Sequence, residues 1–157
     1  MVITADDHAT AVIAGVPVSV ATSTAIVTMV STSAVPISLP TSTMQTISGT
    51  LAKNPTSSTT AIAYVATKQT FTGGGPTVTV KSQATDLPGP YSLALPAAAP
   101  VLGQYDSGSL PILFTAPSGS GGRYDIEVSA AGYQTGTGSV DISIADVIKD
   151  FTLTPVP

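Results

Sequence analysis

The sequence contains no cysteine, no tryptophan and one histidine, and only 9% of its 157 residues are charged. Without cysteine the chain has no thiolate nucleophile, no zinc ribbon and no disulfide framework. A serine triad needs a histidine base that is oriented by a carboxylate, and the lone His8 lies near the terminus beside Asp6 and Asp7. These absences predict a protein that is not an enzyme and that uses no cofactor and no metal ion.

Positive charge is also scarce, with five lysines and arginines against nine acidic residues and a net charge of −4. Nucleic-acid binding requires several cationic contacts to phosphates, so nucleic acid is not expected as a partner. No apolar run approaches the roughly 20 residues that span a bilayer, and the start of the chain lacks the basic region of a signal peptide. Low charge with much serine, threonine, glycine and proline is typical of exported β proteins, so we expect an extracellular or cell-surface location.

What the chain does have is an apolar content of 43%, enough to bury a core. Apolar and polar residues alternate with a period of two, as in Val16, Val18 and Val20, and again in Tyr124, Ile126 and Val128. Short segments of this kind, separated by glycine and proline turns, predict an all-β antiparallel sandwich. Strands are expected over residues 11–20, 24–30, 34–39, 45–52, 60–67, 76–83, 90–95, 110–116, 122–130, 137–144 and 148–154.

Two regions of the chain are distinguished by their patterns. Pro17 and Pro36 interrupt apolar alternations, which confines their segments to edge strands or bulges. Residues 1–46 are therefore predicted to form an N-terminal β extension or docking segment, and residues 47–157 a β-sandwich. A helix over residues 144–151 is the alternative to the last strand, because its apolar residues also fit helical spacing.

Five motifs follow one another from Ile47 onward. They are Ile47–Leu51, Ala61–Val65, Thr85–Tyr91, Gly122–Tyr133 and Asp150–Leu153. In this order they resemble the carboxypeptidase regulatory-like domain, over residues 47–155. The resemblance implies a transthyretin-like (prealbumin-like) Greek-key sandwich, here with extra N-terminal strands and an insertion at residues 97–121. Within these motifs Gly89 and Gly132 fit turn positions that need a positive φ.

The remaining candidate sites are weak. Asp125 and Glu127 lie about 7 Å apart on one face of a strand, a spacing found in glycosidases, but the alternation places them toward solvent. Three aromatic residues, Tyr64, Phe71 and Tyr105, are the candidates for contact with a ligand or a partner. No residue is assigned a catalytic, cofactor-binding or metal-binding role.

The sequence therefore predicts a non-enzymatic module with a structural or adhesive role at the cell surface. It is expected to act through protein–protein contacts, including self-association through residues 1–46 or the C-terminal strand into a filament or stalk. The alternative is a carbohydrate- or ligand-binding accessory module of a larger secreted protein. The resemblance adds a third reading, a domain that supports an attached enzyme.

Overall fold

The structure is a computed structural model, and it describes residues 2–14, 40–56, 60–70, 77–106, 109–115 and 121–157. Within these residues the chain is all-β and forms no helix, which confirms the predicted fold class. The strands are β1 (Val2–Ile3), β2 (Ala11–Ala14), β3 (Met44–Lys53), β4 (Ala61–Thr70), β5 (Thr77–Leu87), β6 (Gly89–Pro96), β7 (Val101–Asp106), β8 (Ser109–Thr115), β9 (Arg123–Ala130), β10 (Gly136–Asp141), β11 (Val147–Ile148) and β12 (Phe151–Leu153).

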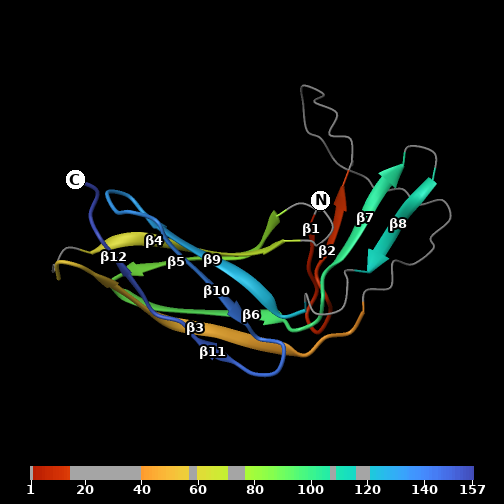
Figure 1. The fold of residues 1–157 in the computed structure, drawn as a ribbon, viewed down its shortest axis with the longest axis horizontal. Helices are drawn as coiled ribbons and strands as arrows, with labels where there is room; N and C mark the ends of the chain where they lie inside the picture. Colours follow the sequence, from red (N-terminus) through yellow and green to blue (C-terminus); the bar gives the residue numbers. More distant parts are fainter. Residues whose placement is uncertain (1, 15–39, 57–59, 71–76, 107–108, 116–120) are drawn as a thin grey trace.

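Two sheets face each other and make the sandwich (Figure 1). The first has the order β10-β9-β4-β5, and all its neighbours are antiparallel. In the second, β3 pairs with β6 antiparallel on one side and with β11 and β12 on the other. The pairing of β11 and β12 with β3 is parallel, so the second sheet is mixed.

The core lies between these two sheets, because the alternating residues of each strand turn one face inward. Tyr124, Ile126 and Val128 of β9 are each at most 1% exposed. The buried Tyr124 hydroxyl donates a hydrogen bond to the carbonyl of Pro96 at 2.7 Å. The other buried members are Ile47, Leu51, Ala63, Val65, Leu87, Tyr91, Leu93, Leu95, Ile142, Phe151 and Leu153. Each large apolar side chain that is fully buried contributes about 1.5–3 kcal/mol to stability.

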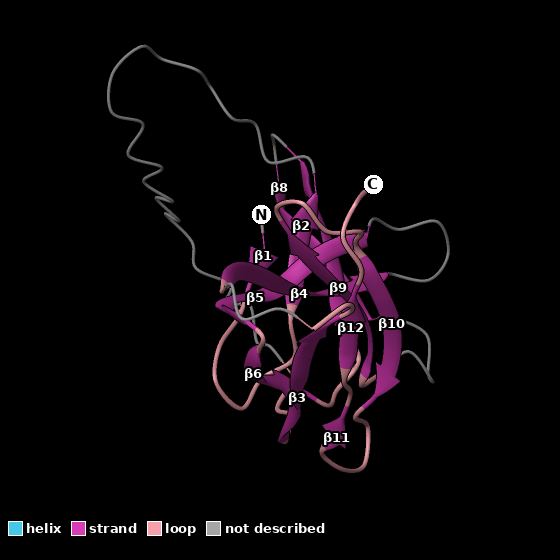
Figure 2. Ribbon diagram, turned by 90° about the vertical axis from the view of Figure 1, so that its left-hand side faces the viewer, coloured by secondary structure: helices cyan, strands magenta, loops and turns pink. Residues whose placement is uncertain are grey.

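A third sheet, with the order β1-β2-β7-β8, lies at one end of the sandwich (Figures 1 and 2). It joins the start of the chain to the predicted insertion, because β2 pairs with β7 in parallel, Ala11 opposite Val101. Backbone hydrogen bonds also connect Ala9 to Pro40, and Ser42 to Asp7. The segment that leads into β2 is therefore held between residues 40–43 and the segment that leads into β7.

The predicted strands agree with the structure from β3 onward, with three differences. β7 was not predicted. The predicted last strand is confirmed in place of the helical alternative, but it is divided into β11 and β12. The strand predicted over residues 137–144 ends at Asp141, whose carboxylate accepts a hydrogen bond from the Ser143 amide at 2.9 Å and so forms a turn. The strands predicted at residues 24–30 and 34–39, and most of that at 11–20, lie outside the described residues.

The two glycines singled out in the sequence serve different purposes. Gly132 has a φ of 81°, as predicted for a turn position that favours glycine. Gly89 does not have a positive φ, so the prediction that this position needs glycine for its φ was wrong. A Cβ at Gly89 would lie 2.5 Å from the carbonyl oxygen of Asp86, so lack of space demands glycine there.

Candidate functional site

One long side of the sandwich is closed by side chains of β5 that bind the backbone of β6. The Lys81 ammonium donates to the Ala94 carbonyl at 3.0 Å. Two residues further along β5, the Gln83 side-chain oxygen accepts from the Ser92 amide at 3.1 Å. The Thr85 hydroxyl then donates to the Pro90 carbonyl at 2.7 Å.

These three contacts repeat every second residue on both strands, so they follow the outer edge of β6. They occupy backbone groups that an unpaired edge would present to another chain. We call Lys81, Gln83 and Thr85 the β5 clasp. The β5 clasp makes the outer edge of β6 a poor place for a further strand to pair.

The opposite side of the sandwich, where β11 and β12 lie, is held by two carboxylates. Asp146 accepts a hydrogen bond from the amide of Thr46, and Asp150 accepts one from the amide of Thr50, both at 2.7 Å. The Thr50 hydroxyl also donates to Asp150 at 2.9 Å. The backbone and side-chain hydrogen bonds from Thr50 lower the pKa of Asp150.

Between β11 and β12 the chain passes very close to β3. A Cβ at Gly49 would lie 2.1 Å from the carbonyl oxygen of Lys149, so only glycine fits at that point of β3. That same carbonyl accepts a hydrogen bond from the hydroxyl of Tyr91 on β6. Burial, together with the nearby charge of Asp150, raises the pKa of Tyr91 to about 12, so the hydroxyl keeps its proton at neutral pH.

The last residues of the chain are also engaged within the molecule. The Gln134 amide donates to the Thr154 carbonyl at 2.8 Å, and the Val156 amide donates to the Gly132 carbonyl at 2.9 Å. The tail after β12 therefore has backbone partners in the turn between β9 and β10.

The third sheet differs from the sandwich at its outer strand. In the described part of the chain β8 pairs with β7 alone, on one of its two sides. The residues of β8, Ser109–Thr115, include no charged residue and contain one proline, Pro111. Charged residues, above all lysine, are the usual protection of a strand edge. The sequence of β8 lacks that protection.

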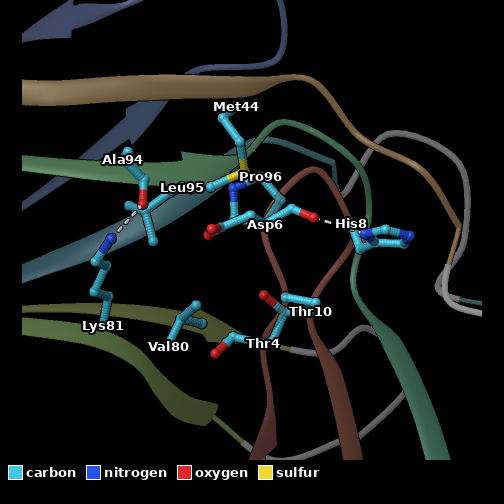
Figure 3. Close-up of a pocket in the computed structure, with 11 residues that line it drawn as sticks. Thr4, Asp6, His8, Thr10, Met44, Val80, Lys81, Ala94, Leu95 and Pro96 are labelled. Atoms are coloured by element: carbon cyan, nitrogen blue, oxygen red, sulfur yellow. Dashed lines mark hydrogen bonds between the residues drawn. The ribbon is translucent and has the colours of Figure 1, made fainter.

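A small cavity lies at the seam between the third sheet and the sandwich, and we call it the seam pocket (Figure 3). Its volume is about 140 Å³. Three parts of the chain line it: the segment before β2, the middle of β5, and the end of β6 with the start of β3. The lining residues are Thr4, Ala5, Asp6, His8, Thr10, Met44, Val80, Lys81, Ala94, Leu95 and Pro96.

A second hollow, of about 370 Å³, is shallower and lies over β4, β9 and β10. Its polar residues include Lys68 and Glu127, which form an ion pair at 2.6 Å. Asp125, Thr137 and Ser139 contribute further oxygens. We call this the sheet hollow.

Two of the three aromatic residues proposed to contact a ligand or a partner lie within the described residues. Tyr64 of β4 is 58% exposed and pairs with the small residues Ala84 and Ser129 on either side. Phe71 lies outside the described residues, and Tyr105 belongs to β7. Asp125 is exposed, as predicted from the alternation in β9, while Glu127 is half-buried beside Lys68.

His8 makes no catalytic arrangement in the described structure. Its Nδ1 lies 2.7 Å from the carbonyl oxygen of Asp6, and its ring points away from the interior of the seam pocket (Figure 3). Within the described residues, no group of three or more histidine, aspartate or glutamate side chains is arranged to hold a metal ion. No helix in that part of the chain is long and apolar enough to cross a membrane.

The sequence analysis did not find the seam pocket. Thr4, Asp6 and Thr10 are separated from Val80 and Lys81 by about seventy residues, and the pocket exists only because the segment before β2 packs on the sandwich. A small sign was present in the sequence, since Lys81 is the only cationic residue of the alternating segment Thr77–Lys81.

The chain was compared with protein-family models and with curated proteins. No protein-family model matches the chain, and no curated protein is significantly similar to it in sequence.

Proposed function

We propose that this protein is a non-enzymatic, exported β-sandwich module with a structural or adhesive role at the cell surface. Copies of it assemble when a strand of one molecule pairs with β8 of the next. The transthyretin-like family and its Greek-key connectivity are part of this proposal, and they rest on the order of motifs in residues 47–155.

One observation carries the proposal, the contrast between the strand edges. The outer edge of β6 is occupied by the β5 clasp, and the side of β3 opposite β6 is occupied by β11 and β12. The tail after β12 is bonded to the turn at Gly132–Gln134. In the described residues β8 has no comparable cover, and unlike the edge strands β5 and β10 it contains no charged residue, so it is the edge best suited to accept another strand.

The strand that pairs with β8 is assigned to residues 15–39 of a neighbouring copy. These residues directly follow β2 in the sequence, and β2 belongs to the same sheet as β8. They contain no charged residue. They are rich in valine, isoleucine and threonine, the residue types that favour strands. Backbone pairing of such a segment gives affinity, while its alternate side chains determine the register.

Negative-stain electron microscopy and size-exclusion chromatography with light scattering test this assembly. The wild-type chain should form filaments or regular oligomers. The variants Ile112→Lys and Leu113→Lys, which each introduce a charge into β8, should shift the protein toward the monomer. Ser139→Lys, on the exposed face of the edge strand β10, is the matched control and should assemble like the wild type.

The absence of cysteine allows a direct test of the donor segment. Two single-cysteine proteins, Leu113→Cys and Val27→Cys, are mixed and oxidised, and neighbouring positions in residues 24–30 are scanned in the same way. A disulfide-linked heterodimer is expected at one register. A wild-type protein that is monomeric at all concentrations, with no heterodimer across the scan, contradicts the proposal.

Carbohydrate binding is the second candidate function, and one observation favours it. Tyr64 presents an exposed ring on the outer face of its sheet, and Glu127 of the sheet hollow lies opposite Ala66, the next same-face residue of β4. An aromatic ring beside carboxylate and hydroxyl oxygens suits a sugar. A glycan array probes this directly: Tyr64→Ala should abolish any hit, Ile144→Ala should not, and an array without hits removes the candidate.

A further inference from the structure

The walls of the seam pocket carry two opposite charges that do not neutralise each other. Asp6 extends from the segment before β2, and Lys81 from β5. Figure 3 shows the Asp6 carboxylate directed into the pocket and the Lys81 ammonium on its opposite side, next to Ala94. Among the described residues, the two side chains form no ion pair with each other.

A buried hydroxyl without a partner faces the same space. Thr10 is 1% exposed, and its Oγ1 has no hydrogen-bond partner in the structure. In Figure 3 this oxygen points into the seam pocket, between Asp6 and Val80. Burying a hydroxyl without a hydrogen bond costs about 1–3 kcal/mol, so a molecule in the pocket that bonds to Thr10 recovers that cost.

The rest of the lining is mostly apolar, and Met44, Val80 and Leu95 lie beside the polar groups. Asp6 and Lys81 are themselves exposed, so water reaches both charges. A ligand that pairs with both charges at once therefore gains more than one that pairs with either charge alone.

From these three features we infer that the seam pocket binds a small zwitterion with the chemistry of an α-amino acid. The ammonium group of the ligand pairs with Asp6, and its carboxylate pairs with Lys81 and accepts a hydrogen bond from Thr10. Lys81 donates one of its three protons to Ala94, so two remain for the ligand. An anion alone leaves Asp6 unmatched, and a cation alone leaves Lys81 unmatched.

The volume sets the size of the ligand. A cavity of about 150 Å³ accepts a molecule of roughly six heavy atoms, such as benzene, and the seam pocket measures about 140 Å³. Alanine and glycine match that size. Since the pocket also joins the third sheet to the sandwich, ligand binding is expected to stabilise their contact.

Isothermal titration calorimetry of the full chain with L-alanine tests the inference, with the amide resonances of the β2 and β5 segments as a second readout. Saturable one-to-one binding is expected, together with a rise of the melting temperature that follows ligand concentration. Acetate, ethylamine and glycerol are the comparison probes, and each should bind at least about tenfold more weakly than alanine.

Two substitutions test the assigned contacts. Asp6→Asn and Thr10→Val should each weaken L-alanine binding about tenfold or more, which corresponds to about 1.4 kcal/mol. Asp7→Asn is the matched control, because the neighbouring carboxylate does not line the pocket and asparagine tolerates its positive φ of 59°. Equal binding by Asp6→Asn and the wild type, or no saturation by about 50 mM alanine, overturns the inference and leaves water as the partner of Thr10.

Discussion

Asp150 accepts hydrogen bonds from both the backbone amide and the side-chain hydroxyl of Thr50, at 2.7 and 2.9 Å, across the parallel pairing of β12 with β3. One carboxylate oxygen receives both bonds, at the point where the chain is interrupted between β11 and β12. The carboxylate thus substitutes for the regular strand contact that this interruption removes.

Stability should therefore depend on pH through Asp150. Its pKa is lowered in the folded protein, so the folded state binds fewer protons than the unfolded chain near the unfolded pKa of about 3.9. The stabilisation is present above that unfolded pKa and is lost as the pH falls through the folded pKa.

Urea unfolding at about pH 7 and about pH 3 measures this effect. Asp150→Asn should lose stability at the higher pH and show a weaker dependence on pH than the wild type. Asp86→Asn, which removes an exposed carboxylate of β5, is the control. The prediction is wrong if both variants keep the pH dependence of the wild type.

Gly49→Ala should destabilise the protein by about 2 kcal/mol or more, because the new Cβ meets the carbonyl of Lys149, which is backbone and cannot rotate away. Gly138→Ala is the matched comparison. There the Cβ meets the Cε of Lys149 at 2.9 Å, the far end of a flexible side chain. Thermal unfolding of the two variants separates the cases, and an equal loss in both would contradict the backbone argument.

Gln69 offers a stabilising substitution. It is 2% exposed, and neither its Nε2 nor its Oε1 has a hydrogen-bond partner in the structure. Gln69→Met keeps a similar length and removes two buried polar atoms, so we expect a gain of about 1–2 kcal/mol.

Thr67 gives the opposite case on the same inward face of β4. Its buried hydroxyl donates to the Lys81 carbonyl at 3.0 Å, and Thr67→Val should cost about 1 kcal/mol. Chemical denaturation of both variants tests the expected gain in stability for Gln69→Met and the expected loss for Thr67→Val. A loss of stability in Gln69→Met would show that ordered water satisfies the amide.

Removal of the β5 clasp should open the edge of β6 to pairing with other chains. Gln83→Leu with Thr85→Val removes the side-chain partners of the Ser92 amide and the Pro90 carbonyl. Light scattering and thioflavin fluorescence should then report faster aggregation at equal stability. Ser82→Ala with Ala84→Val alters exposed β5 residues outside the clasp and should leave the aggregation rate unchanged.

The alternation of apolar residues predicted most strands of the sandwich because each sheet has one dry face. Tyr124, Ile126 and Val128 illustrate this, since all three are buried and their neighbours face outward. β7 was missed because Val101–Asp106 includes Gly103 and shows no clear period of two. Local patterns in such a segment do not distinguish a strand from a loop.

Contacts between distant segments were outside the reach of the sequence. Parallel pairing of β11 with β3 depends on how the whole sandwich closes, and Val147 and Ile148 by themselves are compatible with either direction. The seam pocket depends on three segments that meet only in the folded molecule. The aromatic candidates were selected by residue type, and that criterion could not point to Asp6, Thr10 and Lys81.

The parallel pairing of β3 with β11 and β12 also has a consequence for synthesis of the chain. The residues of β3 that pair on this side do so with residues 100 positions later, such as Ile47 with Val147 and Leu51 with Phe151. During translation β3 therefore emerges long before its partner on that side, and the edge stays uncovered until β11 and β12 have also left the ribosome. Such non-local pairing is slow to form, and an uncovered edge is prone to join other chains. Nascent copies held close together on one messenger RNA are therefore exposed to mispairing during the interval between the emergence of β3 and that of β11 and β12.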